Sequence, residues 1–294
     1  MYGKLYASEL LNRKVSDNMI HTAPKINLHT HCCRCRHATG TVADYVKCAD
    51  DAGISVIGIS DHIPFEDFEH HPDRMFFYEL PDYIKEIEEA QKNHPDMLIL
   101  KGLEMDYRPV LGKAYYQETY FEKLGLDYMI GGAHYTPARE GRTSRWCSYI
   151  RPIPPELLRE FVELTIATME TGLVAYMAHP DLTAVACDRW KPEYKALYRE
   201  IIDASLALDI PLEINAYGFR KPYVDTPEGT RPPYPWLPFW EMAAEANVKA
   251  VIGMDAHRPE DVSSNYAEVR AFADKLGLRL CEEEVVQKIL QKKK

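Results

Sequence analysis

The segment KINLHTH, residues 25–31, is a short apolar strand that runs directly into two histidines, and the same order recurs along the chain. Nearly continuous apolar character is what a strand buried on both faces requires. Because side chains alternate along a strand, His29 and His31 share one face. Seven segments have this strand character: 25–29, 54–60, 97–104, 128–133, 173–178, 211–215 and 250–254.

Amphipathic segments of helical period separate these strands. In the first, Thr41 is a candidate N-cap and Gly53 suits the left-handed residue that ends a helix. Strand–helix alternation predicts parallel strands joined by crossover helices. Seven such units favour an α/β fold with a closed (β/α) barrel, and an open doubly wound sheet is the alternative. We expect one domain, residues 25–294, after an N-terminal extension, residues 1–24.

The amino-acid composition argues against nucleic acid and membranes as binding partners. The 294 residues carry a formal net charge of -10, which argues against nucleic acid because non-specific binding needs a basic surface. No apolar run of secretory or membrane-spanning length interrupts the charged N-terminus or the rest of the chain, so a cytoplasmic protein without a membrane partner is expected. An odd count of seven cysteines favours reduced thiols. Nothing in the sequence indicates the oligomeric state.

Imidazoles and carboxylates stand at the carboxyl ends of the predicted strands. In a parallel barrel these ends converge on one face, where active sites are built. Imidazole combined with carboxylate favours Zn, Mn or Fe over Ca or Mg. The candidate metal ligands are therefore the histidines at or just after these strand ends (His29, His31, His37, His62, His134, His179 and His257) and carboxylates that stand among them, such as Glu104 and Asp255. The other histidines (His21, His70, His71 and His94) are expected to face solvent, with His70 and His71 as candidates for the pocket mouth.

A C-x-x-C pattern lies between two of these histidines, in Cys32-Cys33-Arg34-Cys35. A redox or zinc motif is one interpretation. No second C-x-x-C accompanies it, so thiols near the metal site without a ligand role are the favoured prediction.

These motifs together resemble the PHP (polymerase and histidinol phosphatase) superfamily over about His29–Val262. They are H-x-H, a histidine six residues later, S-D-H, G-x-E-x-D-Y, a lone histidine after a glycine-rich strand, H-x-D and D-A-H. The resemblance implies a distorted (β/α)7 barrel with three divalent ions. It implies that one ion is bound by His29, His31, Glu104 and Asp255. A second would be bound by His134, His179 and a bridging Glu104, and a third by His37, His62 and His257.

Within the superfamily, the chain is similar to the stand-alone histidinol-phosphate phosphatases in residues 35–40, 102–107, 213–221 and 255–262. This similarity implies hydrolysis of L-histidinol phosphate to L-histidinol and phosphate, a step of histidine biosynthesis, by a hydroxide that bridges two ions. Gly132 and Ala133 depart from the usual serine and valine. The stretch after His179 lacks a basic residue that is common in the family.

Other residues near the predicted strand ends are candidates for binding the substrate or supporting the metal ligands. Arg220, at a strand end, is expected to bind phosphoryl oxygens, with a surface cation as the alternative. Asp61 and Asp106 lie near the site by sequence and are candidates either for protonating the leaving group or for orienting ligand histidines. Candidates for pocket walls are Tyr135, Tyr217, Tyr223 and Trp190. The expected substrate is a small phosphomonoester. The alternatives are a PHP phosphodiesterase or nucleotide phosphatase, a protein-tyrosine phosphatase, and a metal-binding scaffold without activity.

Overall fold

The computed structural model describes residues 23–69, 73–136, 145–147 and 151–292. Of the expected N-terminal extension, residues 1–22 lie outside this part. Among the described residues, eight strands form one sheet in which neighbouring strands pair in parallel. In spatial order they are β1 (Ile26–Asn27), β2 (Val56–Ile59), β3 (Leu98–Asp106), β4 (Tyr128–Gly132), β7 (Val174–Met177), β8 (Leu212–Asn215), β11 (Lys249–Gly253) and β12 (Arg279–Leu280). The seven predicted strands and their parallel order are confirmed.

The sheet curls until its first strand meets β11. An isolated parallel bridge joins Thr30 to Ala256, and the His31 N–H donates to the Ala256 carbonyl at 2.9 Å. The bridge lies just beyond the last residues of β1 and β11, so the barrel closes at its carboxyl end. The short strand β12, which the sequence did not predict, pairs with the first two residues of β11 at the amino end. The barrel is distorted because a bridge closes it at the carboxyl end while the extra strand β12 is added at the amino end.

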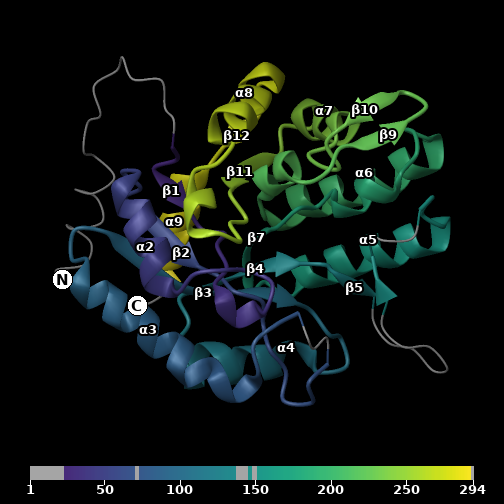
Figure 1. Cartoon of the computed structure of the whole chain (residues 1–294). Coiled ribbons are helices and arrows are strands. Elements are labelled where there is room, and N and C mark those ends of the chain that lie inside the picture. The colour runs from purple at the N-terminus through teal and green to yellow at the C-terminus, as the bar shows by residue number, and fades with distance from the viewer. Residues whose placement is uncertain (1–22, 70–72, 137–144, 148–150, 293–294) are drawn as a thin grey trace.

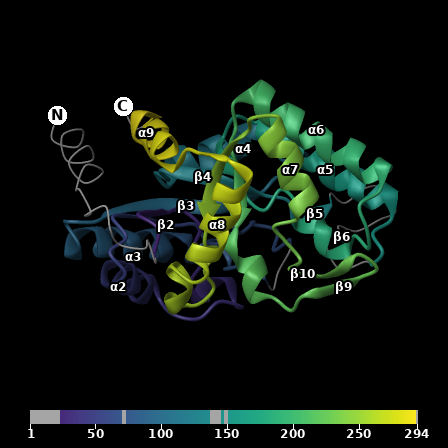
Figure 2. The ribbon, with the colours of Figure 1, turned by 90° about the horizontal axis from the view of Figure 1, so that it is seen from above.

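Helices surround the sheet, with α2 and α3 on one side and α5 and α6 on the opposite side (Figures 1 and 2). The α-helices are α2 (Val42–Asp51), α3 (Leu80–Asn93), α4 (Gly112–Tyr116), α5 (Pro155–Glu170), α6 (Pro192–Leu208), α7 (Leu237–Glu245), α8 (Tyr266–Leu276) and α9 (Glu282–Lys292). Thr41 caps α2 as predicted, because its side chain accepts from the Asp44 N–H while the Asp44 carboxylate accepts from the Thr41 N–H. No described helix is both long and apolar enough to cross a bilayer.

Shorter elements lie around the carboxyl end. The antiparallel pairs are β5 (Tyr135–Thr136) with β6 (Arg145–Trp146), and β9 (Val224–Thr226) with β10 (Gly229–Arg231). The single-turn helices are η1 (Cys33–Cys35), η2 (Phe77–Glu79), η4 (Leu182–Ala186), η5 (Ala216–Arg220) and η6 (Pro259–Val262), and a π-helical stretch, η3 (Gln117–Lys123), continues α4.

The amino end of the barrel interior is apolar. The side chains of β1, β2, β3, β4, β7 and β11 form one cluster with Val285, Val286 and Ile289 of α9. A larger cluster fills the space between the sheet and the outer helices. Helix α9 therefore plugs the amino end, and the carboxyl end is left for polar groups.

The middle of the interior is occupied by one tyrosine. Tyr128 donates from its hydroxyl to the Leu28 carbonyl at 2.7 Å. A Cβ at Gly102 would lie 2.4 Å from the Tyr128 ring, and one at Gly58 would lie 1.9 Å from its hydroxyl. Only glycine fits at these two interior positions, two residues below Glu104 and four below His62. Tyr128 thus forms a floor beneath the strand ends.

Candidate metal centre

The nine predicted ligand residues all lie together at the carboxyl end of the barrel. Sets of three with ligand atoms within 4.8 Å of one another include His29–His31–Asp255, His37–His62–His257 and His29–Glu104–His179. His37 is exposed, whereas the other eight are buried. The cluster is therefore buried on all sides except the one that His37 occupies.

Glu104, on β3, lies at the middle of the cluster. Its Oε1 is 2.8 Å from His179 Nε2 and 3.5 Å from His134 Nε2. Its Oε2 is 2.9 Å from His62 Nδ1 and 3.6 Å from His29 Nε2. A carboxylate with separate imidazoles around each oxygen is placed to serve two cations.

Asp255 provides the second carboxylate, just after β11. Its Oδ1 lies 3.1 Å from His31 Nε2 and 3.3 Å from His257 Nδ1. Its φ of 46° is a left-handed conformation, which costs free energy for a residue other than glycine. The Asn215 amide donates to its Oδ2 at 3.0 Å and holds it there.

Unsatisfied buried atoms show that the residues fit a cation. Within the described residues, Glu104 Oε2, Asp255 Oδ1 and His62 Nδ1 make no hydrogen bond. The 2.9 Å contact between His62 Nδ1 and Glu104 Oε2 is an ion-pair contact and leaves both atoms without a hydrogen bond. Buried acceptors without partners are costly, and a bound divalent ion removes that cost. This donor set fits a divalent metal.

Acidic residues stand behind the histidines, as expected for Asp61 and Asp106. Asp61 Oδ1 is 3.4 Å from His31 Nδ1, and Asp106 Oδ2 is 3.2 Å from His134 Nδ1. A carboxylate on the far ring nitrogen sets the imidazole tautomer and its orientation.

Glu213 has the same arrangement but was not among the predicted site residues. Its Oε1 is 2.8 Å from His29 Nδ1, and its Oε2 accepts from the His179 N–H at 3.1 Å. Glu213 could have been predicted from its position in Glu213-Ile214-Asn215, at the carboxyl end of the sixth predicted strand.

Burial and charge set the protonation of the cluster. Burial opposes ionisation of Glu104, but the surrounding histidines, first His134 and His62, lower its pKa well below the usual value. Burial and the nearby charge of His31 lower the pKa of His257 to about 4. Burial, followed by the charge of His31, also lowers the pKa of His37. Against the opposing effect of burial, nearby carboxylates raise the pKa of His29 and that of His31, the latter to about 9. These imidazoles therefore release protons when a metal ion binds, because neutral imidazole and ionised carboxylate are the ligand forms.

The position of Arg220 differs from the expectation. Its guanidinium donates to the carbonyls of Ser264 (3.1 Å), Met254 and Asp255 (3.2 Å), and its Nε lies 3.5 Å from Asp261 Oδ2. Main-chain oxygens next to Asp255 therefore occupy the planar fork that was expected to bind phosphate. Arg220 supports the strained turn at Asp255 instead.

The next residue, Lys221, faces the centre. Its ammonium lies 4.5 Å from the Tyr217 ring centre and 5.6 Å from that of Tyr234. The Tyr217 ring stacks on His257 at 4.8 Å. Burial lowers the pKa of Lys221, with the charge of Asp255 opposing that shift. Among the described residues, no carboxylate forms an ion pair with Lys221.

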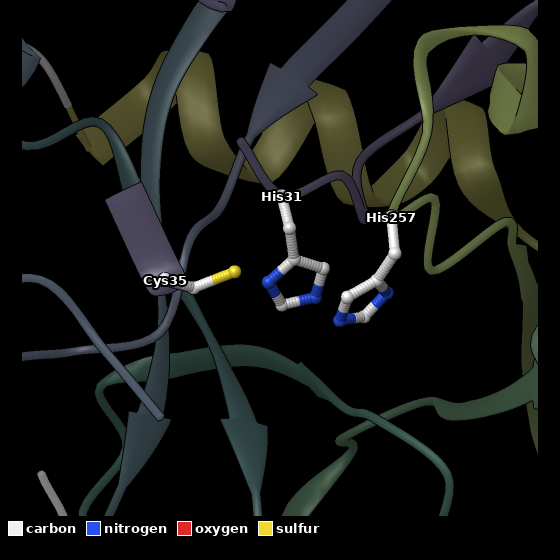
Figure 3. Close-up of side chains that lie close together, drawn as sticks. All are labelled: His31, Cys35 and His257. Atoms are coloured by element: carbon white, nitrogen blue, oxygen red, sulfur yellow. The ribbon is translucent and has the colours of Figure 1, made fainter. Parts of the chain in front are cut away.

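The cysteines lie beside the cluster, as predicted. Cys32 donates from its Sγ to Asp61 Oδ2 at 3.0 Å, and Cys35 donates to the Cys32 carbonyl. The Cys35 sulfur is directed toward the His31 ring, which stacks on His257 at 4.1 Å (Figure 3). Cys35, His31 and His257 also form a set with ligand atoms within 4.8 Å.

Two of the four aromatic residues expected to line the pocket lie at the site, and two do not. Tyr135 and Tyr217 contact the site, but Tyr223 is 54% exposed and Trp190 packs against Tyr198 and Trp236. His94 follows α3 and is partly exposed. His21, His70 and His71 lie outside the described residues.

An α/β barrel that gathers imidazoles and carboxylates at its carboxyl end defines the class of metal-dependent hydrolases. The PHP domain family matches residues 27–217. A protein of Deinococcus radiodurans named probable histidinol-phosphatase is 30% identical over 242 residues, which cover 82% of this chain and 89% of that protein. A protein of the same name from Schizosaccharomyces pombe is 24% identical over 86% of this chain and 87% of its own length.

Solved structures show the same fold. The putative histidinol phosphatase of Listeria monocytogenes aligns with a TM-score of 0.63 at 20% identity, over 83% of this chain and 99% of that one. The histidinol phosphate phosphatase of Lactococcus lactis, solved with Zn, L-histidinol and phosphate, aligns with a TM-score of 0.62 at 17% identity, over 87% and 94%. The chain belongs to the PHP domain family. It is a metal-dependent enzyme of the phosphatase type and resembles the histidinol-phosphatases in particular.

Proposed function

We propose that this enzyme hydrolyses a small phosphomonoester, L-histidinol phosphate, at a centre of three divalent ions of Zn, Mn or Fe. The observation that carries the proposal is the convergence of nine ligand residues around Glu104. The relatives named histidinol-phosphatases support the substrate, and the Lactococcus lactis structure with Zn, L-histidinol and phosphate supports both metal and substrate class.

The ligands divide among three sites in this proposal. His29, His31, Asp255 and Glu104 would hold the first ion, and Glu104, His134 and His179 would hold the second. His37, His62 and His257, whose ligand atoms lie within 4.8 Å of one another, would hold the third. Bound divalent ions supply Lewis acidity and lower the pKa of bound water toward 7.

Charge favours a phosphomonoester over a neutral ester. Three divalent ions bring six positive charges, and the ligand carboxylates of Glu104 and Asp255 compensate two. A phosphate dianion offsets much of the excess. The carboxylates of Asp61, Asp106 and Glu213 contact the far ring nitrogens of His31, His134 and His29 and hold these imidazoles in one tautomer.

Lys221 is our candidate for binding a phosphoryl oxygen in place of Arg220. The ammonium is half-buried and lies above Tyr217, which itself covers His257. A compact cation at the edge of the cluster can donate to an anion bound there. Replacement of Lys221 by Met keeps the stem over Tyr217 and removes the charge, so metal content is expected to stay while kcat/KM falls.

A substrate panel tests the proposed function. The holoenzyme is assayed for phosphate release from histidinol phosphate, a nucleoside monophosphate and a phosphotyrosine peptide, and for nitrophenol release from bis-p-nitrophenyl phosphate. We expect the highest kcat/KM with histidinol phosphate. The largest value with the diester or the peptide would replace this assignment by a phosphodiesterase or a tyrosine phosphatase. No turnover with any substrate by fully loaded protein would leave a metal-binding scaffold.

A further inference from the structure

An acidic and aromatic wall stands beside the exposed side of the centre. Tyr135 directly follows the ligand His134 and donates from its hydroxyl to Asp73 Oδ2 at 2.5 Å. On the paired strand β6, Trp146 meets the Tyr135 ring edge-on at 4.7 Å and lies 5.7 Å from the His134 ring. We call Asp73, Tyr135 and Trp146 together the leaving-group wall.

Asp73 places a negative charge at the mouth. Its side chain is partly exposed, and its charge acts on His37, the one exposed residue of the ligand set. Asp73 therefore contacts the residue that follows His134 and is within electrostatic reach of His37. The neighbouring Arg74 is buried and directs its guanidinium to the Ile63 carbonyl at 2.8 Å and to Asp106 at 3.1 Å.

We infer that the leaving-group wall selects phosphomonoesters whose alcohol carries a positive charge, with Asp73 as the specificity-determining residue. This inference rests on the proposed phosphatase function and names the residues that choose its substrate class. A phosphoryl group at the metal cluster places its ester oxygen and alcohol toward the mouth. There, a carboxylate attracts an ammonium group, and electron-rich Tyr and Trp rings accept a cation.

The same wall acts against other substrates. A carboxylate at the mouth repels an alcohol that carries its own negative charge, so part of the selectivity arises from exclusion. Substrates with an amino-alcohol leaving group, such as histidinol phosphate or phosphoethanolamine, are expected to be favoured over glycerol phosphate. Phosphoglycerate, whose leaving group is anionic, should be the poorest of the set.

Kinetics of the holoenzyme on three substrates test the inference. We expect Asp73→Asn to lower kcat/KM for histidinol phosphate by about 10- to 100-fold, mainly through KM, as for loss of a charge-assisted hydrogen bond. Activity on glycerol phosphate should stay within about twofold, which also reports intact folding and metal loading. Asp73→Lys should raise kcat/KM for phosphoglycerate relative to glycerol phosphate.

Two matched variants separate charge from other effects. Tyr135→Phe removes the hydroxyl but keeps the carboxylate, so its loss on histidinol phosphate should be smaller than that of Asp73→Asn. Asp203→Asn, on α6 with Arg199 as its partner, makes the same change in net charge far from the mouth and should change nothing. Calorimetry with L-histidinol alone should show about tenfold weaker binding to the Asp73→Asn holoenzyme.

The outcomes distinguish this inference from the proposed function. Hydrolysis by wild-type enzyme that ignores leaving-group charge would overturn the inference and leave the phosphatase standing. An equal fall on all three substrates in Asp73→Asn would also overturn it, because Asp73 would then act through the metal centre. Absence of phosphomonoester hydrolysis in wild type would overturn both.

Discussion

The two ends of the barrel interior are equally buried but are built from opposite chemistry. The amino end is filled by apolar strand residues and by Val285, Val286 and Ile289 of α9. The carboxyl end holds seven histidines and two carboxylates as candidate ligands, and all of these except His37 are buried. Burial of apolar surface stabilises the fold. Burial of ionisable groups costs free energy unless they are paired or bind metal.

One scaffold therefore separates stability from function along its axis. Tyr128 lies at the boundary, with Gly58 and Gly102 making room for its ring. Changes below this floor should alter the free energy of unfolding with little effect on chemistry. Changes above it should alter metal binding and turnover with less effect on the fold.

The largest effect is expected for Glu104→Gln. Loss of one charge leaves the cations that it served uncompensated, and breaking a buried pair typically costs roughly 3–5 kcal/mol. We expect metal content to fall by one or two ions per chain and kcat to fall by about a thousandfold or more. The matched control is Glu88→Gln, an exposed carboxylate that pairs with Lys101 away from the metal centre. Elemental analysis and phosphate release measure both. Full metal content with normal kcat in Glu104→Gln would show that metal binding at the carboxyl end does not depend on this carboxylate.

At the other end, Ile289→Ala should act on stability alone. The side chain is 3% exposed within the plug, and large-to-small changes of this kind cost about 2–5 kcal/mol. Urea unfolding should show a lower midpoint with an unchanged slope. Well below the melting temperature, kcat and metal content should match those of wild type. A loss of metal in the folded variant would show that the two ends are coupled.

Asp61→Asn should weaken metal binding without removing a predicted ligand. Asp61 orients His31, and loss of such a partner typically lowers metal affinity about 10- to 100-fold. Competition with a chromophoric chelator measures the change. We expect excess metal to restore most of the activity, which separates this variant from Glu104→Gln. An unaltered affinity would mean that Asp61 serves only Cys32 and the backbone.

The smallest effect is expected at Asp209, an exposed residue near the amino end. Lys249 and Lys288 donate to it at 2.7 Å each and lower its pKa to about 2. A depressed carboxyl pKa stabilises the fold above about pH 4, its unfolded value, and this contribution disappears as the pH falls toward 2. Because the side chain is 58% exposed, Asp209→Asn should cost at most about 1 kcal/mol at pH 7. Chemical denaturation at pH 7 and pH 3 measures it, and a loss that grows on acidification would contradict the sign.

The sequence predicted the parts of the site that depend on strand position. Strand ends converge in any parallel barrel, so His29, Glu104 and Asp255 could be placed near one another without coordinates. Side-chain direction beyond a strand end could not be predicted in the same way. Residues 216–220 form a turn of 3-10 helix, and this turn directs Arg220 to main-chain oxygens and leaves Lys221 at the centre. The pairing of Asp73 with Tyr135 joins residues 62 positions apart, which no local pattern reports.

Anomalous diffraction from crystals of the protein purified without chelator tests the central claim most directly. Data collected at the absorption edges of Zn, Mn and Fe should show three peaks, each about 2.0–2.2 Å from imidazole nitrogens or carboxylate oxygens, with Glu104 between two of them. Peaks absent from this cluster, or bound to residues outside the nine, would contradict the account.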